Sequence, residues 1–310
     1  MNNLYYLVSA NKYLALRGYQ GSEWITINKS HLSPAEKHEA IEVRRVDLQP
    51  NRPAVFDQEG VPCLNLWIPP TIQPRPNPYP RIEKILEYQT GRNVGGEWCP
   101  DPTGYQWLKN WLAFKVQNPA EKPTHGVLLT GPEGDGRKTL FAIVAEILGR
   151  ANCDIAYPCH VRDSARRWKP SLLVYLGDVR PTQRLTSLLT SPEVPFGQKW
   201  FKTSAPNRTA FIAGSSEKVP VMDVHVSRFS TLGVRFKSFG PHWDLLCSFS
   251  DNGCGGGFKP DVIQEIEGFA HDLWQHPVRA EWLTMAYDGR ESRRLNGYWD
   301  SAPPQSEATS

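Results

Sequence analysis

The pattern of apolar and polar residues predicts small strands over the first 70 residues. Short runs of β-branched and aromatic residues alternate there with turn residues such as Gly18, Asn28 and Gly60. The runs are Tyr5–Val8, Tyr13–Leu16, Trp24–Ile27, Ile41–Val46 and Leu64–Ile68. Six prolines follow within Pro69–Pro80. They predict an extended connector that cannot be helical, and we expect a domain boundary there.

Three segments have apolar residues at the spacing of one helix face. They are Tyr105–Val116, Leu140–Leu148 and Pro260–Trp274, and a shorter helix is predicted over Arg81–Gln89. The tryptophans of the first segment are expected to pack in the core rather than to stack on bases.

Three apolar runs predict buried strands. They are Gly126–Thr130, Ser171–Leu176 and Thr209–Gly214. Continuous apolar runs are typical of a parallel sheet whose two faces are covered. A further β-like run lies within Val221–Val234. Because helical and strand patterns alternate here, the sequence favours the α/β class.

A glycine-rich turn joins the first of these strands to the second helix. Its glycines are Gly131, Gly134 and Gly136. Strand, glycine loop and helix are the layout of a P-loop, in which backbone N–H groups bind phosphate, a lysine reaches the β and γ phosphates and a hydroxyl holds Mg²⁺. We therefore expect ATP and Mg²⁺ as ligands. The plain alternative is a glycine turn that only joins a strand to a helix.

The P-loop pattern is imperfect after its last glycine. Arg137 stands where lysine belongs, and Lys138 stands where the hydroxyl belongs. Either the loop is one residue longer, so that Lys138 and Thr139 take the usual roles, or the register holds and Arg137 is the cation that faces phosphate. Arginine is a wide planar fork and does not simply replace a slim ammonium group.

Acidic and basic candidates follow further along the chain. Asp178 comes after the second apolar strand, where a Walker B carboxylate would hold Mg²⁺ and orient water. Thr139 and Asp178 are the predicted ligands of Mg²⁺. Two acids are usual at the Walker B position, and because Asp178 stands alone, we expect weak activation of the attacking water. The basic, aromatic segment Pro192–Arg208 predicts a hairpin around Phe196–Lys199.

Lys199 and Lys202 of this hairpin have two interpretations. They either lie on an ordinary exposed surface or contact the phosphates of a nucleic acid.

Composition leaves room for one large domain or two modest ones in 310 residues, and a net charge of +3 permits nucleic-acid binding without requiring it. The six cysteines include no CxxC pair, which disfavours a zinc site, and the N-terminus has no signal-peptide pattern. No apolar run is as long as a membrane span. We expect a cytoplasmic protein with reduced thiols and no membrane partner.

Five blocks together resemble the helicase part of phage- and plasmid-type primase-helicases, the poxvirus-like branch of the superfamily 3 helicases. The blocks are Asn65–Pro70 (NLWIPP), Trp107–Phe141, Ser171–Arg180, Pro206–Ser216 and Val226–Phe229 (VSRF). The likeness covers roughly Asn65–Phe236. It implies an AAA+-like P-loop NTPase core that assembles into a hexameric ring around DNA, with a single strand as the expected partner.

The resemblance assigns roles residue by residue, with departures. Four positions fit the family's P-loop: Gly131, Gly134, Gly136 and Thr139. Asp178 matches the second Walker B acid, whereas Gly177 replaces the first. The sensor strand ends in Ser215 and Ser216, so the sensor amide is missing from the position of Ser216.

Two further roles follow from the same likeness. Arg228 fits the arginine finger that acts on a neighbouring subunit's nucleotide, although the residues before it differ from the family pattern. Lys199 and Lys202 lie where the family places its DNA-contacting loop.

The sequence therefore predicts four regions. They are a small β-rich region (1–70), a proline-rich connector with a helical segment (71–120), a P-loop ATPase-like core (121–240) and a helical C-terminal region with a disordered tail (241–310). One functional hypothesis is an ATP-dependent DNA helicase or translocase of a phage or mobile element, acting in DNA replication with weakened turnover. The other is a catalytically inactive pseudo-ATPase, a ring or adaptor that binds DNA or regulates a partner helicase.

Overall fold

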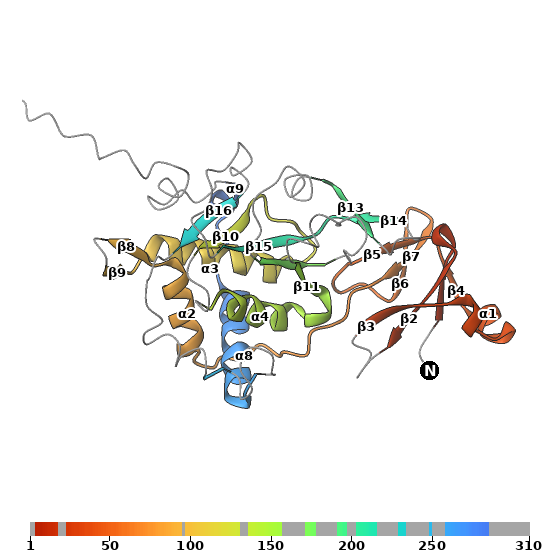
Figure 1. The fold of residues 1–310 in the computed structure, drawn as a ribbon, viewed down its shortest axis with the longest axis horizontal. Helices are drawn as coiled ribbons and strands as arrows, with labels where there is room; N and C mark the ends of the chain where they lie inside the picture. The colour runs from red at the N-terminus through yellow and green to blue at the C-terminus, as the bar shows by residue number, and fades with distance from the viewer. Residues whose placement is uncertain are drawn as a thin grey trace, which may run out of the picture.

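Five parallel strands form the central sheet of the protein (Figure 1). They are β10 (Gly126–Thr130), β11 (Cys153–Ala156), β12 (Leu173–Gly177), β15 (Ala210–Ser215) and β16 (Phe229–Gly233). Their order is β11-β12-β15-β10-β16, and each neighbouring pair is parallel. Every residue of β12 is buried. The predicted α/β class with a parallel sheet is therefore confirmed.

The computed structural model describes residues 4–17, 23–94, 97–130, 136–156, 171–177, 191–196, 203–215, 229–233, 248–249 and 258–284. No helix in these ranges has the length and apolar character needed to cross a membrane.

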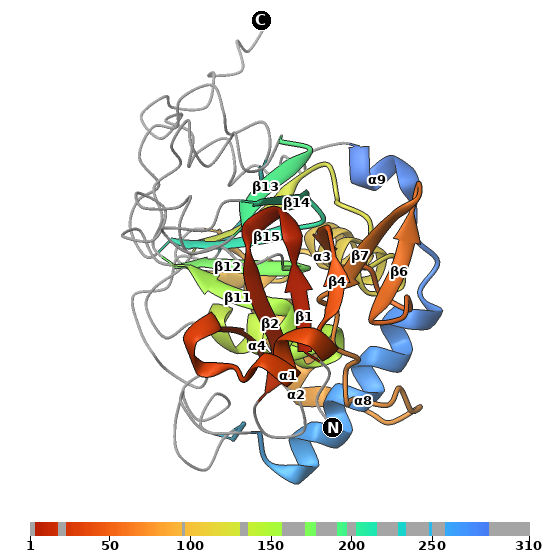
Figure 2. The ribbon, with the colours of Figure 1, turned by 90° about the vertical axis from the view of Figure 1, so that its right-hand side faces the viewer.

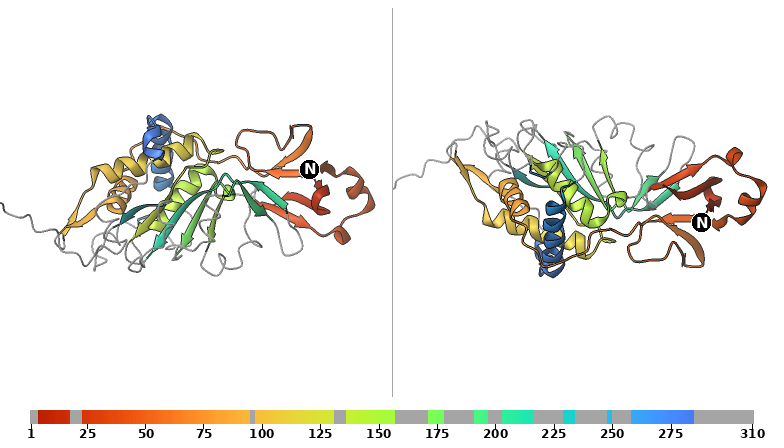
Figure 3. Two further views of the ribbon diagram at one scale, coloured as in Figure 1. Left: turned by 90° about the horizontal axis from the view of Figure 1, so that it is seen from above. Right: turned by 90° about the horizontal axis from the view of Figure 1, so that it is seen from below.

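Helices α2 (Pro80–Thr90), α3 (Pro102–Gln117), α4 (Arg137–Leu148) and α8 (Pro260–Gln275) pack on one another and cover one face of the sheet (Figure 3). The four predicted helices are thus present, within a few residues of the expected ends. α2, α3 and α8 each begin with a proline in the first turn, where the missing N–H would have no helical partner. The short α9 (Ala280–Thr284) contacts α3.

Burial follows the periodicity of the sequence. The predicted apolar face of α4 is buried at every position: Leu140, Ile143, Val144, Ile147 and Leu148. In α3, Trp107 and Trp111 are buried, and their indole N–H groups donate to the carbonyls of Trp282 (3.1 Å) and His125 (2.8 Å). The expectation that these aromatic rings pack in the core is confirmed.

Seven strands between Leu4 and Asn65 form two small sheets beside the central one (Figure 2). The four-stranded sheet has the order β3-β2-β1-β4, with β1 (Leu4–Leu7), β2 (Lys12–Arg17), β3 (Glu23–Ile27) and β4 (Ile41–Val43). The three-stranded sheet has the order β5-β7-β6, with β5 (Arg45–Asp47), β6 (Val55–Gln58) and β7 (Val61–Asn65). Between β3 and β4 lies α1 (Pro34–Glu39), which begins with a capping box of Ser33 and Glu36.

Two strand predictions need correction in this region. The run from Ile41 to Val46 divides into β4 and β5, which belong to different sheets. The last predicted strand begins earlier, at Val61, and ends at Asn65. There Asn65 turns its side chain to the backbone: its amide donates to the carbonyls of Gln49 and Arg52, and its oxygen accepts from the N–H of Trp67. The buried amide of Asn65 thus ends the strand.

The proline-rich connector runs from β7 to α2 without helix or strand, as predicted, and is fixed at both ends. At its start, Asn152 donates to the carbonyl of Ile68 (2.7 Å) and accepts from its N–H (3.0 Å). Further along, Arg75 N–H donates to the carbonyl of Glu267 (3.2 Å), so the connector crosses α8. Gly268 makes this crossing close, because a Cβ there would overlap the carbonyl oxygen of Asn77.

The crossing of the connector over α8 predicts the effect of Gly268→Ala. Alanine in a helix is normally more favourable than glycine by about 1 kcal/mol. Here the added methyl group meets backbone, so we expect unfolding free energy to fall by about 2 kcal/mol. Gly60→Ala is the control, since a Cβ at Gly60 has open space and suffers only from the positive φ of 77°. Chemical denaturation measures both; a stabilised Gly268→Ala variant would contradict the crossing.

Candidate functional site

The carboxyl ends of the central strands meet at one edge of the sheet. Thr130, the last residue of β10, pairs with Ser215 of β15 on one side and Gly233 of β16 on the other. The chain leaves β10 toward β11 and leaves β15 toward β16, in opposite directions across the sheet. In open α/β sheets, ligands bind outside the carboxyl ends where connections diverge in this way. The glycine-rich turn after Thr130 begins at that place.

The start of α4 has the geometry of an anion-binding helix end. Gly136 has φ 95° and ψ 0°, a left-handed conformation that glycine adopts readily, and the helix begins at the next residue. Leu140 N–H donates to the carbonyl of Gly136 (2.8 Å). The N–H groups of the three residues before Leu140 have no carbonyl four residues back within the helix. Together with the helix dipole, such N–H groups favour a bound anion.

The two cations that follow Gly136 have different environments. The Arg137 side chain is 5% exposed, and its Nη1 donates to the carbonyl of Leu129 in β10 at 3.4 Å. Lys138 is exposed, and Thr139 is partly buried. The Arg137 side chain is therefore turned back toward β10. Which of the two cations faces phosphate stays a prediction, because residues 131–135 lie outside the described part of the chain.

Most of the predicted site residues lie outside the described part of the chain. They are Gly131, Gly134, Asp178, Lys199, Lys202, Ser216 and Arg228. Their neighbours are described. Gly177 and Ser215 are the last residues of β12 and β15, at the carboxyl edge. Phe229, the residue after Arg228, pairs with Gly126 at the opposite, amino edge. The roles of these residues remain predictions.

Tyr175 is a buried polar residue near the carboxyl edge that the sequence analysis did not single out. Its ring centroid lies 5.5 Å from that of Phe141, under the first turns of α4. Its hydroxyl lies against Gly214, where a Cβ would overlap it. Gly214 thus makes room for the tyrosine. The signal in the sequence is the one hydroxyl-bearing residue inside an apolar strand.

At the amino edge lies the hairpin of β13 (Glu193–Phe196) and β14 (Thr203–Pro206), an antiparallel pair that confirms the predicted hairpin. β14 packs beside β5 of the N-terminal region (Figure 1). Asn207 closes the base of the hairpin: its N–H donates to the carbonyl of Pro192 (2.8 Å), and its amide donates to that of Ser191 (2.9 Å). Another antiparallel pair, β8 (Arg92–Val94) and β9 (Glu97–Cys99), follows α2.

A fully buried lysine lies at this hairpin base. Lys115, near the end of α3, is 0% exposed, and its ammonium group donates to the carbonyls of Pro119 (2.8 Å), Glu121 (2.8 Å) and Arg208 (2.9 Å). Three acceptors match the three protons of an ammonium group. Burial lowers the pKa of Lys115 to about 7, because the low-dielectric surroundings disfavour its charge.

Arg208 uses its side chain as well as its carbonyl. Its Nε and Nη2 bind the two carboxylate oxygens of Asp47 at 3.1 and 3.0 Å, and its Nη1 donates to the carbonyl of Ala120 at 3.1 Å. Asp47 is 1% exposed and also accepts from Leu48 N–H and the Gln49 amide. Arg208 ends the basic segment that is predicted to form the hairpin. In the structure its charge is paired with a carboxylate of the N-terminal region.

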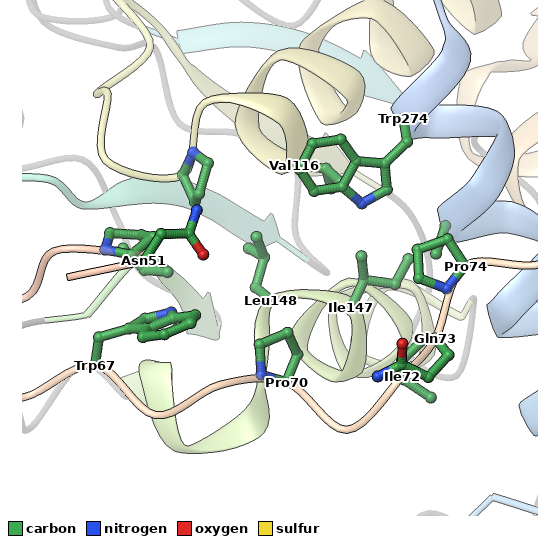
Figure 4. Close-up of a pocket in the computed structure, with 14 residues that line it drawn as sticks. Asn51, Trp67, Pro70, Ile72, Gln73, Pro74, Val116, Ile147, Leu148 and Trp274 are labelled. Atoms are coloured by element: carbon green, nitrogen blue, oxygen red, sulfur yellow. The ribbon is translucent and has the colours of Figure 1, made fainter. Parts of the chain in front are cut away.

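A cavity of about 270 Å³ lies between the connector, α4 and α8 (Figure 4). Trp67 and Trp274 lie on opposite sides of it, with Ile147 and Leu148 between them. None of the described residues that line it carries a charge. The cavity is therefore unsuited to a phosphate group. Within the described ranges, no group of three or more His, Cys, Asp or Glu side chains is arranged to hold a metal ion.

The comparison with solved structures adds one finding. The chain is similar to the C-terminal region of NrS-1. Three structures of that region match with TM-scores of 0.70, 0.71 and 0.69 at sequence identities of 16%, 18% and 18%. The matches cover 96%, 97% and 96% of this chain and 72% of the NrS-1 chain. At these identities the likeness shows a shared fold. No protein-family model matches the chain, and no curated protein sequence does.

The buried ammonium of Lys115 predicts a pH dependence of stability. Between pH 7 and the ordinary lysine value of 10.5, the unfolded chain binds one proton more than the folded chain, so unfolding free energy rises with pH in this window. The slope from this one group is at most about 1.4 kcal/mol per pH unit. Denaturant unfolding at pH 7 and pH 9 measures it, with Lys115→Met as the reference that lacks the group. Equal slopes for the two proteins would contradict the prediction.

Proposed function

We propose that the protein is an ATP-dependent DNA helicase or translocase with slow ATP turnover, acting in the DNA replication of a phage or mobile element. The observation that supports this best is the left-handed Gly136 at the start of α4, at the carboxyl edge of a parallel sheet. The shared fold with the C-terminal region of NrS-1 extends over nearly the whole chain and supports the same proposal. The proposed helicase or translocase activity is the one that the sequence resemblance to primase-helicases implies.

In this proposal the glycine turn and the first amides of α4 bind the polyphosphate of ATP. Arg137 supplies the cation at the position of the usual lysine, and its Nη1 lies at the carbonyl of Leu129, one residue before the end of β10. In this register Lys138 takes the position of the usual hydroxyl, so Asp178 and Thr139, one residue further on, would hold Mg²⁺. When bound, Mg²⁺ neutralises charge on the β and γ phosphates.

Slow turnover follows from three departures around this site. Gly177, at the position of the first Walker B acid, is buried and has no side chain. The sensor position holds Ser216 instead of an amide. Arg137 is wider than the lysine of a standard loop, and its guanidinium already donates to the carbonyl of Leu129.

The ring assembly is part of the proposal because of where β16 begins. Phe229, the neighbour of Arg228, lies at the amino edge, and the glycine turn follows β10 at the carboxyl edge. An arginine attached beside Phe229 is therefore suited to the nucleotide of a neighbouring subunit. Arginine fingers contribute factors of about 10³ to 10⁵ in rate.

The second candidate function is a pseudo-ATPase ring or adaptor that binds DNA without turnover. The buried Gly177 favours it, because a site with one acid positions water poorly. In both candidates, Lys199 and Lys202 on the β13–β14 hairpin bind the phosphates of single-stranded DNA.

Restoring the P-loop pattern distinguishes the two functions. Arg137→Lys combined with Lys138→Thr gives the sequence Gly-Lys-Thr at the end of the loop. If Arg137 is what slows the enzyme, we expect the steady-state rate of ATP hydrolysis in the presence of single-stranded DNA to rise by about tenfold. This corresponds to an activation free energy lower by about 1.4 kcal/mol. Arg228→Ala should abolish the DNA-stimulated rate.

The matched control is Lys138→Ala, which changes an exposed side chain and should alter nucleotide affinity little. DNA binding without hydrolysis, in the wild type and in the restored loop alike, would support the pseudo-ATPase. Loss of ATP binding in Lys138→Ala with full binding in Arg137→Ala would overturn the assignment of Arg137.

The hairpin lysines predict a salt-dependent effect. Lys199→Ala and Lys202→Ala should each weaken single-stranded DNA binding for all sequences alike and reduce the slope of log affinity against log salt by about 0.7. Fluorescence anisotropy over a salt series measures this. Lys84→Ala, on the exposed side of α2, is the control and should leave the slope unchanged. An unchanged slope in both hairpin variants would remove the hairpin from the DNA-binding surface.

A further inference from the structure

We propose that Asp47, Arg208 and Lys115 are positioning residues that hold the β13–β14 hairpin in the orientation in which it binds nucleic acid. The N-terminal β-region would then act as the structural support of that hairpin. The inference rests on the proposed function, in which the hairpin contacts DNA, and adds residues that lie outside the hairpin strands and the nucleotide site.

The β13–β14 hairpin is too short to be stable by itself. Its two strands have four residues each, paired from Glu193 with Pro206 to Phe196 with Thr203. An isolated two-stranded hairpin is marginally stable in water and needs packing against other elements. The orientation of this hairpin therefore depends on what holds its base.

Arg208 joins three parts of the chain at the base of the hairpin. Its backbone carbonyl accepts from Lys115 of α3, and its guanidinium binds Asp47 at the end of β5 and the carbonyl of Ala120 before β10. Bidentate arginine–carboxylate pairs fix direction as well as distance. Since Arg208 follows β14 by two residues, these bonds fix the point at which the hairpin leaves the sheet.

The charged groups of this joint are largely shielded from solvent. Asp47 is 1% exposed, Lys115 is 0% exposed and the Arg208 side chain is 21% exposed. Removing one partner of a buried charge pair leaves the other uncompensated, which makes such a joint sensitive to single substitutions. On the other side of the base, Lys122 donates to the carbonyl of Ser191 at 3.4 Å. Both strands of the hairpin are thus held where they begin and end.

The joint lies at the amino edge of the central sheet. Pro119 and Glu121 lie in the loop that leads into β10, and Arg208 lies just before β15. Lys115 therefore joins the amino ends of two adjacent parallel strands. A loosened joint frees the hairpin base while the helices and the carboxyl edge keep their own contacts.

The test is Asp47→Asn, which keeps the shape of the side chain and removes its charge. We expect amide hydrogen exchange in residues 193–196 and 203–206 to increase by about tenfold, and single-stranded DNA affinity to fall by about tenfold, well below the melting temperature. Hydrogen exchange with mass spectrometry and fluorescence anisotropy are the measurements. Arg208→Lys keeps the charge and loses the fork, so it should give an intermediate effect and serves if Asp47→Asn does not fold.

The control is Glu265→Gln. Glu265 is 7% exposed and binds Arg81 with an Nε to Oε1 distance of 2.5 Å, so it is also a buried carboxylate paired with arginine, between α8 and α2. We expect hairpin exchange and DNA affinity in this variant to remain those of the wild type. This separates positioning from general destabilisation.

Unchanged hairpin exchange in Asp47→Asn would overturn the inference, and so would an equal loss of DNA affinity in Glu265→Gln. If the wild-type chain does not bind DNA, the proposed function fails, together with the nucleic-acid role of the hairpin. Hydrogen exchange would still decide separately whether the three residues hold the hairpin.

Discussion

The parallel pairing of the five central strands is the constraint on which the rest of the structure depends. Because every strand runs in the same direction, the ends of β10, β12 and β15 lie at one edge, and the hairpin base lies at the other. Parallel strands bury both faces, which explains the unbroken apolar run that ends in Leu176. The start of α4 and the base of the β13–β14 hairpin are therefore at opposite edges of the sheet.

The amino edge is held by charged groups inside the protein. Carbonyl oxygens bind the ammonium group of Lys115, and the carboxylate of Asp47 binds Arg208. These hydrogen bonds take the place of bonds to water and so compensate for burial of the charges. Such an arrangement contributes directional constraint more than net stability. It links the N-terminal β-region to the hairpin, and the connector through Asn152 and Gly268 links the same region to α4 and α8.

The geometry of the candidate site could be predicted in part. The spacing of Gly131 and Gly136 and the apolar face of α4 indicated a strand, a turn and a helix, and the strand and the helix are present. The choice between Arg137 and Lys138 could not be made from spacing, because one residue of loop length moves each side chain by about 100° around the helix. The structure places Arg137 in the interior and Lys138 at the surface.

The sequence by itself determined the class of the fold, the main helices and the extended connector, because these follow from local periodicity and from the fixed φ of proline. Only the tertiary structure decided that Arg208 is paired with Asp47, that Lys115 is fully buried and that Tyr175 lies over Gly214. The pairs Asp47–Arg208, Lys115–Arg208 and Tyr175–Gly214 each join residues far apart in the sequence. A charged or polar side chain has no periodic signal that names its partner, so its role depends on how the strands and helices are brought together.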